Sequence, residues 1–299
     1  MGVYRSIVVP IDGSALAEHA LQLAASLAAR MQSELHLVHA YQQRVIDELP
    51  VYGLSGDAAR CTAEDFVLAA ADRVRAAHGG VVAGVVLDGS PAPSIVAYAA
   101  SRGADLIVMS SHGRTGASRF WLGSVTDSVI RSATVPVLMV RNRNAAVSPT
   151  AVFERVLVPL DGSSVAEAII PHAMTLARLG NAHVHLLQVE ETAEDVRVSV
   201  WRFAEHVPDD LPARLDRAER YLRHLVERSR SEWAPATATT EARGAHRVSE
   251  AIAQVAIDRD VDLIAMATHG RGASRLLMGS VADKIIRGTE CSILLLRPT

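Results

Sequence analysis

The chain contains one sequence pattern twice. RSIVVPIDG at residues 5–13 returns as RVLVPLDG at 155–162. Likewise, SHGRTGASRFWLGSVTDSVIRS at 111–132 returns as THGRGASRLLMGSVADKIIRG at 268–288, one residue shorter. Because the paired blocks keep their order over nearly the whole length, both halves are predicted to fold as versions of one module.

The length of 299 residues gives each module the ordinary size of a domain, with enough chain to bury a core. The segment RNRNAAVSPT at 141–150 has no periodicity and contains Asn and Pro, which is typical of a linker. We therefore predict one domain at residues 1–143 and a second at 151–299.

The composition excludes several classes of protein. The formal net charge of −3 gives no electrostatic reason to expect nucleic acid or an anionic membrane as a partner. The longest apolar runs are far shorter than the ~20 residues of a membrane span, and the N-terminal sequence enters a strand pattern without a leader. Cys61 and Cys291 occupy non-equivalent positions in the two halves, so no disulfide framework is indicated. We expect a soluble cytoplasmic protein.

Short apolar runs alternate with longer helical patterns in both halves. The continuous run SIVVPID at 6–12 is typical of a strand that is covered on both faces. Further strands are predicted at 34–40, 81–89, 104–111 and 135–141, and in the second half near 155–160, 183–189, 236–243, 262–267 and 291–297. Helices are predicted at 15–31, 62–77, 90–102 and 124–133, and near 163–179, 209–231, 248–259 and 280–287.

This alternation predicts an α/β fold with two tandem, doubly wound, parallel five-stranded sheets of the Rossmann-like kind. In such sheets a ligand binds beyond the carboxyl ends of the strands, at the point where the strand order reverses. The loops after the first and fourth strands lie there, and the repeat reproduces these loops best.

The loop after the fourth strand has the residues of an anion site. Gly113 and Gly123 are separated by nine residues, and Ser124 follows at the start of a predicted helix, where amide groups favour phosphate. Arg114 and Arg119 lie between the glycines and could pair with phosphate oxygens. Gly113 could simply end a strand, and Gly123-Ser124 could simply cap a helix. The combination of both glycines, the arginines and a helix start at a switch point instead favours a phosphate-binding site. Neither a P-loop nor a G-x-G-x-x-G fingerprint occurs.

The loop after the first strand reads Pro-x-Asp-Gly-Ser in both halves, with Asp12 and Asp161 as the carboxylates. These residues could form a helix cap and a tight turn. They could equally place a carboxylate where it accepts a hydrogen bond from an adenine amino group or a ribose hydroxyl. The residues alone favour neither interpretation.

With these loops the chain resembles the universal stress protein family in its form with two tandem domains, and the resemblance covers nearly all of the sequence. Nucleotide-binding members of that family carry Gly-x2-Gly-x9-Gly-[Ser/Thr] after the fourth strand and bind ATP. The resemblance implies an adenine nucleotide alpha hydrolase-like fold, and ATP, with or without Mg²⁺, as the ligand. It also implies a stress-response function in which nucleotide binding, with little or no hydrolysis, regulates a conformation or an oligomeric state.

The resemblance assigns binding roles to matching positions. In the first half these are the Asp12 carboxylate, the backbone of Ala40 beside the base, and the phosphate positions Gly113, Gly123, Ser124 and Val125. Their second-half counterparts are Asp161, Val189, Gly270, Gly279, Ser280 and Val281. Pro10, Met109 and Arg114, with Pro159, Met266 and Arg271, complete the predicted nucleotide sites.

Two departures distinguish the halves from the family pattern. The first glycine of the motif is replaced by Ser110 in one half and by Ala267 in the other. Only eight residues separate Gly270 from Gly279, so the second loop has lost the family spacing. We therefore expect ATP in the first half rather than in the second.

Other residues give weaker signals. His36 and His39 differ by three in a strand, so they point to opposite faces and cannot share a metal ion. His183 and His185 share a face, but no further ligand is visible near them in the sequence. No Ser–His–Asp set, paired carboxylates or CxxC motif supports catalysis, and we predict neither a metal site nor catalytic residues.

The last strand of each half, VPVLMVR and CSILLLR, is apolar and needs a partner. In the family such strands pair domain to domain, which implies an internal pseudo-dimer here, with further pairing of chains and an unidentified protein partner. Two alternatives to ATP-dependent regulation stay open. One is a nucleotide-free interaction protein that works through its surfaces, and the other is a slow ATPase.

Overall fold

The computed structural model describes residues 4–41, 56–111, 122–141, 153–192, 210–268 and 279–298. The chain divides into two compact units, and the main border between them in the sequence falls between residues 151 and 152. Residues 142–150 of the predicted linker lie outside the described residues. The pairing of the two halves as an internal pseudo-dimer stays a prediction.

The first unit is a five-stranded parallel sheet with the order β3-β2-β1-β4-β5. Its strands are β1 (Ser6–Pro10), β2 (Glu34–Tyr41), β3 (Val82–Asp88), β4 (Leu106–Ser110) and β5 (Val137–Val140). Its helices are α1 (Ala15–Met31), α3 (Gly56–His78), α4 (Pro91–Ser101) and α5 (Ser124–Ser132). The strand order reverses between β1 and β4, so this is the switch point of the sheet.

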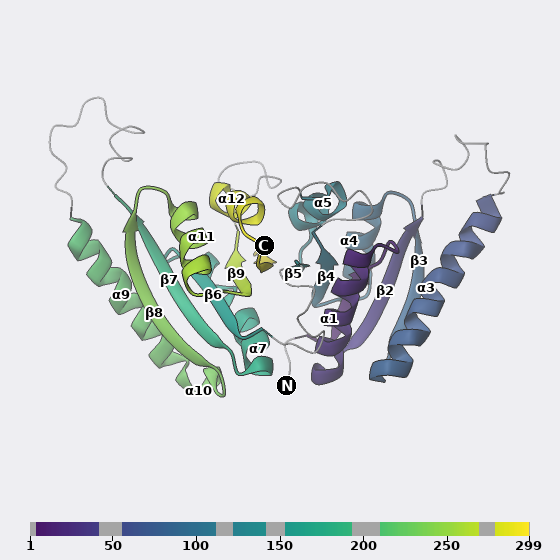
Figure 1. Cartoon of the computed structure of the whole chain (residues 1–299), viewed down its shortest axis with the longest axis horizontal. Helices are drawn as coiled ribbons and strands as arrows, with labels where there is room; N and C mark the ends of the chain where they lie inside the picture. Colours follow the sequence, from purple (N-terminus) through teal and green to yellow (C-terminus); the bar gives the residue numbers. More distant parts are fainter. Residues whose placement is uncertain are drawn as a thin grey trace, which may run out of the picture. The chain divides into compact units, whose positions relative to one another are not determined.

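Helices cover both faces of this sheet (Figure 1). Helices α1 and α3 pack on one face, where α3 runs along β2 and β3, while α4 and α5 pack against each other on the opposite face. Ile7, Val8 and Val9 of β1 are fully buried, as the continuous apolar run predicts. Helix α1 begins where the Ser14 hydroxyl accepts a hydrogen bond from the Ala17 N–H, at 3.1 Å.

The second unit repeats this plan with the strand order β10-β9-β6-β7-β8. Its strands are β6 (Arg155–Leu160), β7 (His183–Glu191), β8 (Thr237–Ala245), β9 (Leu263–Ala267) and β10 (Ser292–Leu296). Its helices are α6 (Ser164–Glu167), α7 (Ile170–Gly180), α9 (Leu211–Arg228), α10 (Arg230–Trp233), α11 (Val248–Asp258) and α12 (Ser280–Gly288). Helices α7 and α9 lie on one face of the sheet, and α11 packs with α12 on the other.

One predicted helix is divided in the structure. The pattern at 163–179 predicts one continuous helix, but α6 ends at Glu167 and α7 begins at Ile170. Pro171 explains the break, because its ring nitrogen cannot donate to the Glu167 carbonyl and the ring crowds that group. The equivalent helix of the first unit, α1, contains no proline and runs without interruption.

No helix in the described part of the chain is both long and apolar enough to cross a membrane.

Candidate functional site

A pocket of about 300 Å³ lies at the carboxyl ends of β1, β2 and β4 in the first unit. It is therefore at the switch point, where ligands of doubly wound sheets bind. Seven of the nine predicted first-half residues line this pocket, together with neighbours from α1 and α4. The lining consists of Pro10, Ile11, Asp12, Ala17, Val38, His39, Ala40, Pro91, Ile95, Met109, Ser110, Gly123, Ser124, Val125 and Thr126.

The Pro-x-Asp-Gly-Ser loop forms a capped turn at the edge of this pocket. Asp12 Oδ1 accepts a hydrogen bond from the Ser14 N–H at 3.0 Å, and Gly13 has a φ of 81°. Side chains rarely tolerate this φ, so the turn requires glycine. The turn and the pocket are compatible, because the half-buried Asp12 also lines the cavity.

The N-terminus of α5 forms the opposite wall. Its first intrahelical bond runs from the Asp127 N–H to the Gly123 carbonyl, at 2.8 Å. The N–H groups of Ser124 and Val125 therefore have no carbonyl four residues back within the helix, and they carry the partial positive charge of its N-terminus. The Thr126 hydroxyl donates to the Ser110 carbonyl at 2.9 Å, which fixes this end of the helix to the end of β4. Such an end favours an anion.

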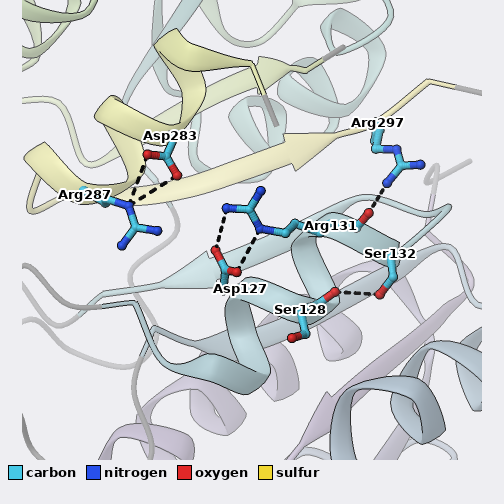
Figure 2. A network of polar contacts seen from close by, with 7 residues as sticks. All are labelled: Asp127, Ser128, Arg131, Ser132, Asp283, Arg287 and Arg297. Atoms are coloured by element: carbon cyan, nitrogen blue, oxygen red, sulfur yellow. Dashed lines mark hydrogen bonds and ion pairs between the residues drawn. The ribbon is translucent and has the colours of Figure 1, made fainter. Parts of the chain in front are cut away.

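An acidic residue in the first turn of α5 is neutralised within the helix (Figure 2). Arg131 donates to both carboxylate oxygens of Asp127, from Nε at 2.8 Å and from Nη2 at 3.1 Å. In α12 of the second unit, Arg287 Nε lies 3.2 Å from Asp283 Oδ2. The pairing reduces the negative charge that Asp127 would otherwise add near the pocket. The D-x-x-x-R spacing, which both repeats contain, is the sequence signal that could have identified this ion pair.

Sequence reasoning missed the contribution of α4, whose residues Pro91 and Ile95 complete the apolar side of the pocket. It also omitted His39 from the site. Nδ1 of His39 donates to the Ile11 carbonyl at 2.8 Å, and its ring meets the Phe66 ring edge-on at 5.4 Å. The position of His39 directly before Ala40 in the sequence was the signal that could have included it in the site.

The second unit places its predicted residues at equivalent positions. Pro159 is the last but one residue of β6, and Pro10 is the last residue of β1. Asp161 Oδ1 accepts a hydrogen bond from the Ser163 N–H at 2.9 Å, as Asp12 Oδ1 does from the Ser14 N–H. Val189 lies on β7 and Met266 on β9, while Gly279, Ser280 and Val281 form the start of α12.

The strand register shows where the two units differ. Pro10 pairs with Val38, and Pro159 pairs with Leu187, so Leu187 and Val189 occupy the positions of Val38 and Ala40. Both replacements are larger. Ala282 stands in the repeated motif where the first unit has Thr126, so the hydroxyl that binds the end of β4 is missing.

Gly113 and Arg114 in the first half, and Gly270 and Arg271 in the second, lie outside the described residues. Arg119 and the rest of the two glycine-rich loops, residues 112–121 and 269–278, also lie outside the described residues.

The histidines of the sheets take structural positions. The ring of His36 hydrogen bonds to the Tyr98 hydroxyl of α4 at 3.0 Å, whereas His39 faces α3, so the two point to opposite faces as predicted. His185 is buried, and its Nε2 donates to Glu241 Oε2 at 3.1 Å. Burial lowers the pKa of His36 and of His185, and it outweighs the carboxylates beside them. Within the described residues no group of three metal-ligating side chains comes together.

Comparison with known proteins gives a consistent family assignment. The family model described as the universal stress protein family matches residues 3–141 and again 153–297. A universal stress protein of Methanocaldococcus jannaschii is 32% identical over 146 residues, which cover 46% of this chain and 83% of the relative.

Two further comparisons extend over both halves. A universal stress protein of Mycolicibacterium smegmatis is 24% identical over 300 residues, covering 98% of this chain and 97% of the relative. The crystal structure of a universal stress protein from Archaeoglobus fulgidus has the same fold, with a TM-score of 0.72, 19% identity and 98% of each chain covered. The chain therefore belongs to the universal stress protein family and contains two tandem copies of its domain.

Proposed function

We propose that this protein binds an adenine nucleotide in the pocket of its first unit and acts as a nucleotide-dependent regulator. ATP, with or without Mg²⁺, is the proposed ligand, and the proposed setting is the stress response of the cytoplasm. Binding, with little or no hydrolysis, would favour one conformation or oligomeric state that a protein partner recognises.

One observation supports this proposal above the others. A single pocket has an apolar wall from β2 and α4 on one side and the N-terminus of α5 on the other. Val38 and Ile95 offer a surface on which a base can be buried, and the first-turn amides of α5 offer donors to phosphate. A ligand that is apolar at one end and anionic at the other matches both walls. Adenine nucleotides have this character, and Asp12 lies where a carboxylate can accept from an amino or hydroxyl group.

The test uses the thermal stability of the full chain with and without ATP. A ligand at 100 times its dissociation constant stabilises the folded state by about 2.7 kcal/mol, which raises Tm by several degrees. We expect Ser124→Glu to abolish this shift, because the new carboxylate would lie among the amides proposed for phosphate. A negative charge at a helix N-terminus is itself stabilising by about 0.3–1 kcal/mol, so the variant should fold.

Two matched variants control this experiment. Ser128→Glu adds the same charge to an exposed position of α5 outside the pocket, and Ser280→Glu adds it at the equivalent position of α12. Both should keep the ATP shift, and GTP should give a smaller shift than ATP. The proposal fails if millimolar ATP leaves Tm unchanged, or if Ser124→Glu keeps the full effect.

A second candidate function is that of a nucleotide-free interaction protein. Ser110 and Ala267, which replace the first glycine of the family motif, favour it, because a side chain there limits the approach of a phosphate. This alternative would be supported if ATP did not change the Tm of the protein and the protein bound a partner protein at defined stoichiometry. A change of oligomeric state on addition of ATP, measured by sedimentation, would support the nucleotide-dependent function.

A further inference from the structure

The turn that carries Asp12 is fixed on both sides. Before it, the Ile11 N–H donates to the Val38 carbonyl at 2.9 Å, and the Ile11 carbonyl accepts a hydrogen bond from His39 Nδ1 at 2.8 Å. After it, the Ser14 N–H donates to Asp12 Oδ1 at 3.0 Å, while the Ser14 hydroxyl caps α1. Both backbone polar groups of the residue before Asp12 are thus bound to β2, and one of them is bound by a side chain.

The ring of His39 is itself held in one orientation. It is half-buried, lines the pocket of the first unit and meets the Phe66 ring of α3 edge-on, with 5.4 Å between the ring centroids and 74° between the ring planes. Two aromatic rings favour this edge-on arrangement. Because a carbonyl oxygen can only accept, Nδ1 carries the proton of the hydrogen bond to Ile11. His39 therefore supplies one directed donor to the turn before Asp12.

The second unit does not repeat this contact. Strand register places Gln188 at the position of His39 and Leu160 at the position of Ile11. The Gln188 amide donates to Glu190 Oε1 at 2.7 Å, and the pairing of β6 with β7 continues to Leu160 and Gln188. In the first unit the strand pairing ends one residue earlier, and the imidazole binds the next carbonyl. The donor from the ring thus belongs to the unit in which we propose that the nucleotide binds.

We propose that His39 is a positioning residue of the nucleotide site, which sets the Asp12 turn for the nucleoside end of the ligand. This role rests on the proposed function, in which Asp12 accepts from the base or the ribose and the start of α5 binds phosphate. Without the donor, the Ile11 carbonyl loses its bond to the ring, and the turn that directs the Asp12 carboxylate loosens. The loss therefore affects recognition of the adenosine part and leaves the phosphate part intact.

The test is calorimetric titration of the full chain with ATP and, separately, with adenosine. His39→Leu should weaken the binding of both ligands by the same factor, about three- to tenfold, as expected for the loss of one neutral hydrogen bond. Ser124→Glu gives the opposite pattern, because it should abolish ATP binding and keep adenosine binding. Unequal losses of ATP and adenosine in His39→Leu, or adenosine that fails to compete with ATP in the wild type, would overturn the role of His39.

A conservative variant separates the donor from the packing of the ring. The amide nitrogen of asparagine is bonded to Cγ, as Nδ1 of histidine is, so His39→Asn keeps a donor near the same place. It should recover most of the affinity that His39→Leu loses, although it lacks the contact with Phe66. An affinity of His39→Asn as low as that of His39→Leu would show that the ring acts through packing and would refute the proposal.

His36→Leu is the matched control. It also removes an imidazole from β2, with its hydrogen bond to the Tyr98 hydroxyl at 3.0 Å, but His36 is not among the described residues that line the pocket. This variant should keep the wild-type affinity for both ligands, and an equal loss in His36→Leu and His39→Leu would contradict a specific role. Wild-type protein that binds no ATP would overturn the proposed function itself. Equal ATP affinity of the wild type and His39→Leu would overturn only the role of His39.

Discussion

Gly123 lines the pocket of the first unit, and Gly13 follows the pocket residue Asp12, but the two glycines meet different physical demands. Gly13 has a φ of 81°, which an L side chain adopts only under strain. Gly123 has a φ of −61° and a ψ of 144°, which any residue can adopt. The fold therefore explains the glycine at 13 but not the one at 123. Close approach of a ligand to the backbone would explain the second.

Alanine substitutions separate these two demands. We expect Gly13→Ala to destabilise the protein by about 1–2 kcal/mol through backbone strain, as measured by urea unfolding. Gly123→Ala should leave the stability nearly unchanged and reduce or abolish the ATP shift, because a methyl group would stand where phosphate approaches. A large loss of stability in Gly123→Ala with an unchanged ATP shift would contradict this assignment.

The buried histidines make stability depend on pH. Burial lowers the pKa of His36 and His185 below the ordinary value of 6.5, with Arg102 and Arg259 adding to the effect and the carboxylates of Glu34 and Glu241 opposing it. The unfolded chain then binds more protons than the folded chain as the pH falls below about 6.5. This stabilisation is fully present above that pH and is lost as the pH falls toward the folded-state pKa values.

We therefore expect the free energy of unfolding to fall between about pH 7.5 and pH 5, and to fall less in His185→Gln. Urea unfolding at the two pH values measures this, and His78→Gln, which changes an exposed histidine, should keep the wild-type dependence. Stability that rises on acidification, or an equal pH dependence in His185→Gln, would contradict the prediction.

Elements were predictable where the signal is local. The apolar run of β1 and the Ser14 cap of α1 specify a buried strand and a helix start from adjacent residues. The break between α6 and α7 was also encoded locally, by Pro171, but the alanine-rich helical pattern around it obscured the signal. Contacts between elements distant in sequence were not predictable. The Asp105 carboxylate before β4 accepts from the N–H groups of Arg5 at 2.7 Å and Ser6 at 3.1 Å, a hundred positions away.

The Asp105 contact joins the start of β4 to the start of β1, and Asp262 repeats it with Arg155 in the second unit. Asp105→Ala should destabilise the protein by about 1 kcal/mol, because the strand-end amides lose an acceptor but can still reach water. Asp105→Asn keeps an acceptor oxygen and should lose less. Urea unfolding of both variants gives the comparison, and equal stability of wild type and Asp105→Ala would refute the contribution.

At the scale of the whole molecule, the repeat predicts two equivalent frameworks but does not predict equal pockets. Both units follow the same strand order from their switch points, and both keep the turn after the first strand and the Gly-Ser-Val helix start. A pocket of about 410 Å³ in the second unit, lined by Gln188 of β7 and Arg217 of α9 among others, was not predicted, because the packing of α9 on β7 appears only in the folded chain.

The two potential nucleotide sites should therefore differ in occupancy. Leu187 and Val189 add three carbon atoms over Val38 and Ala40, and the second glycine loop is one residue shorter. We expect calorimetric titration to give one ATP per chain, with no binding by Ser124→Glu and one site retained by Ser280→Glu. Two equal sites in the wild type, or loss of binding in Ser280→Glu alone, would show that the larger side chains do not close the second pocket. A single site removed by Ser124→Glu would assign nucleotide to the first unit.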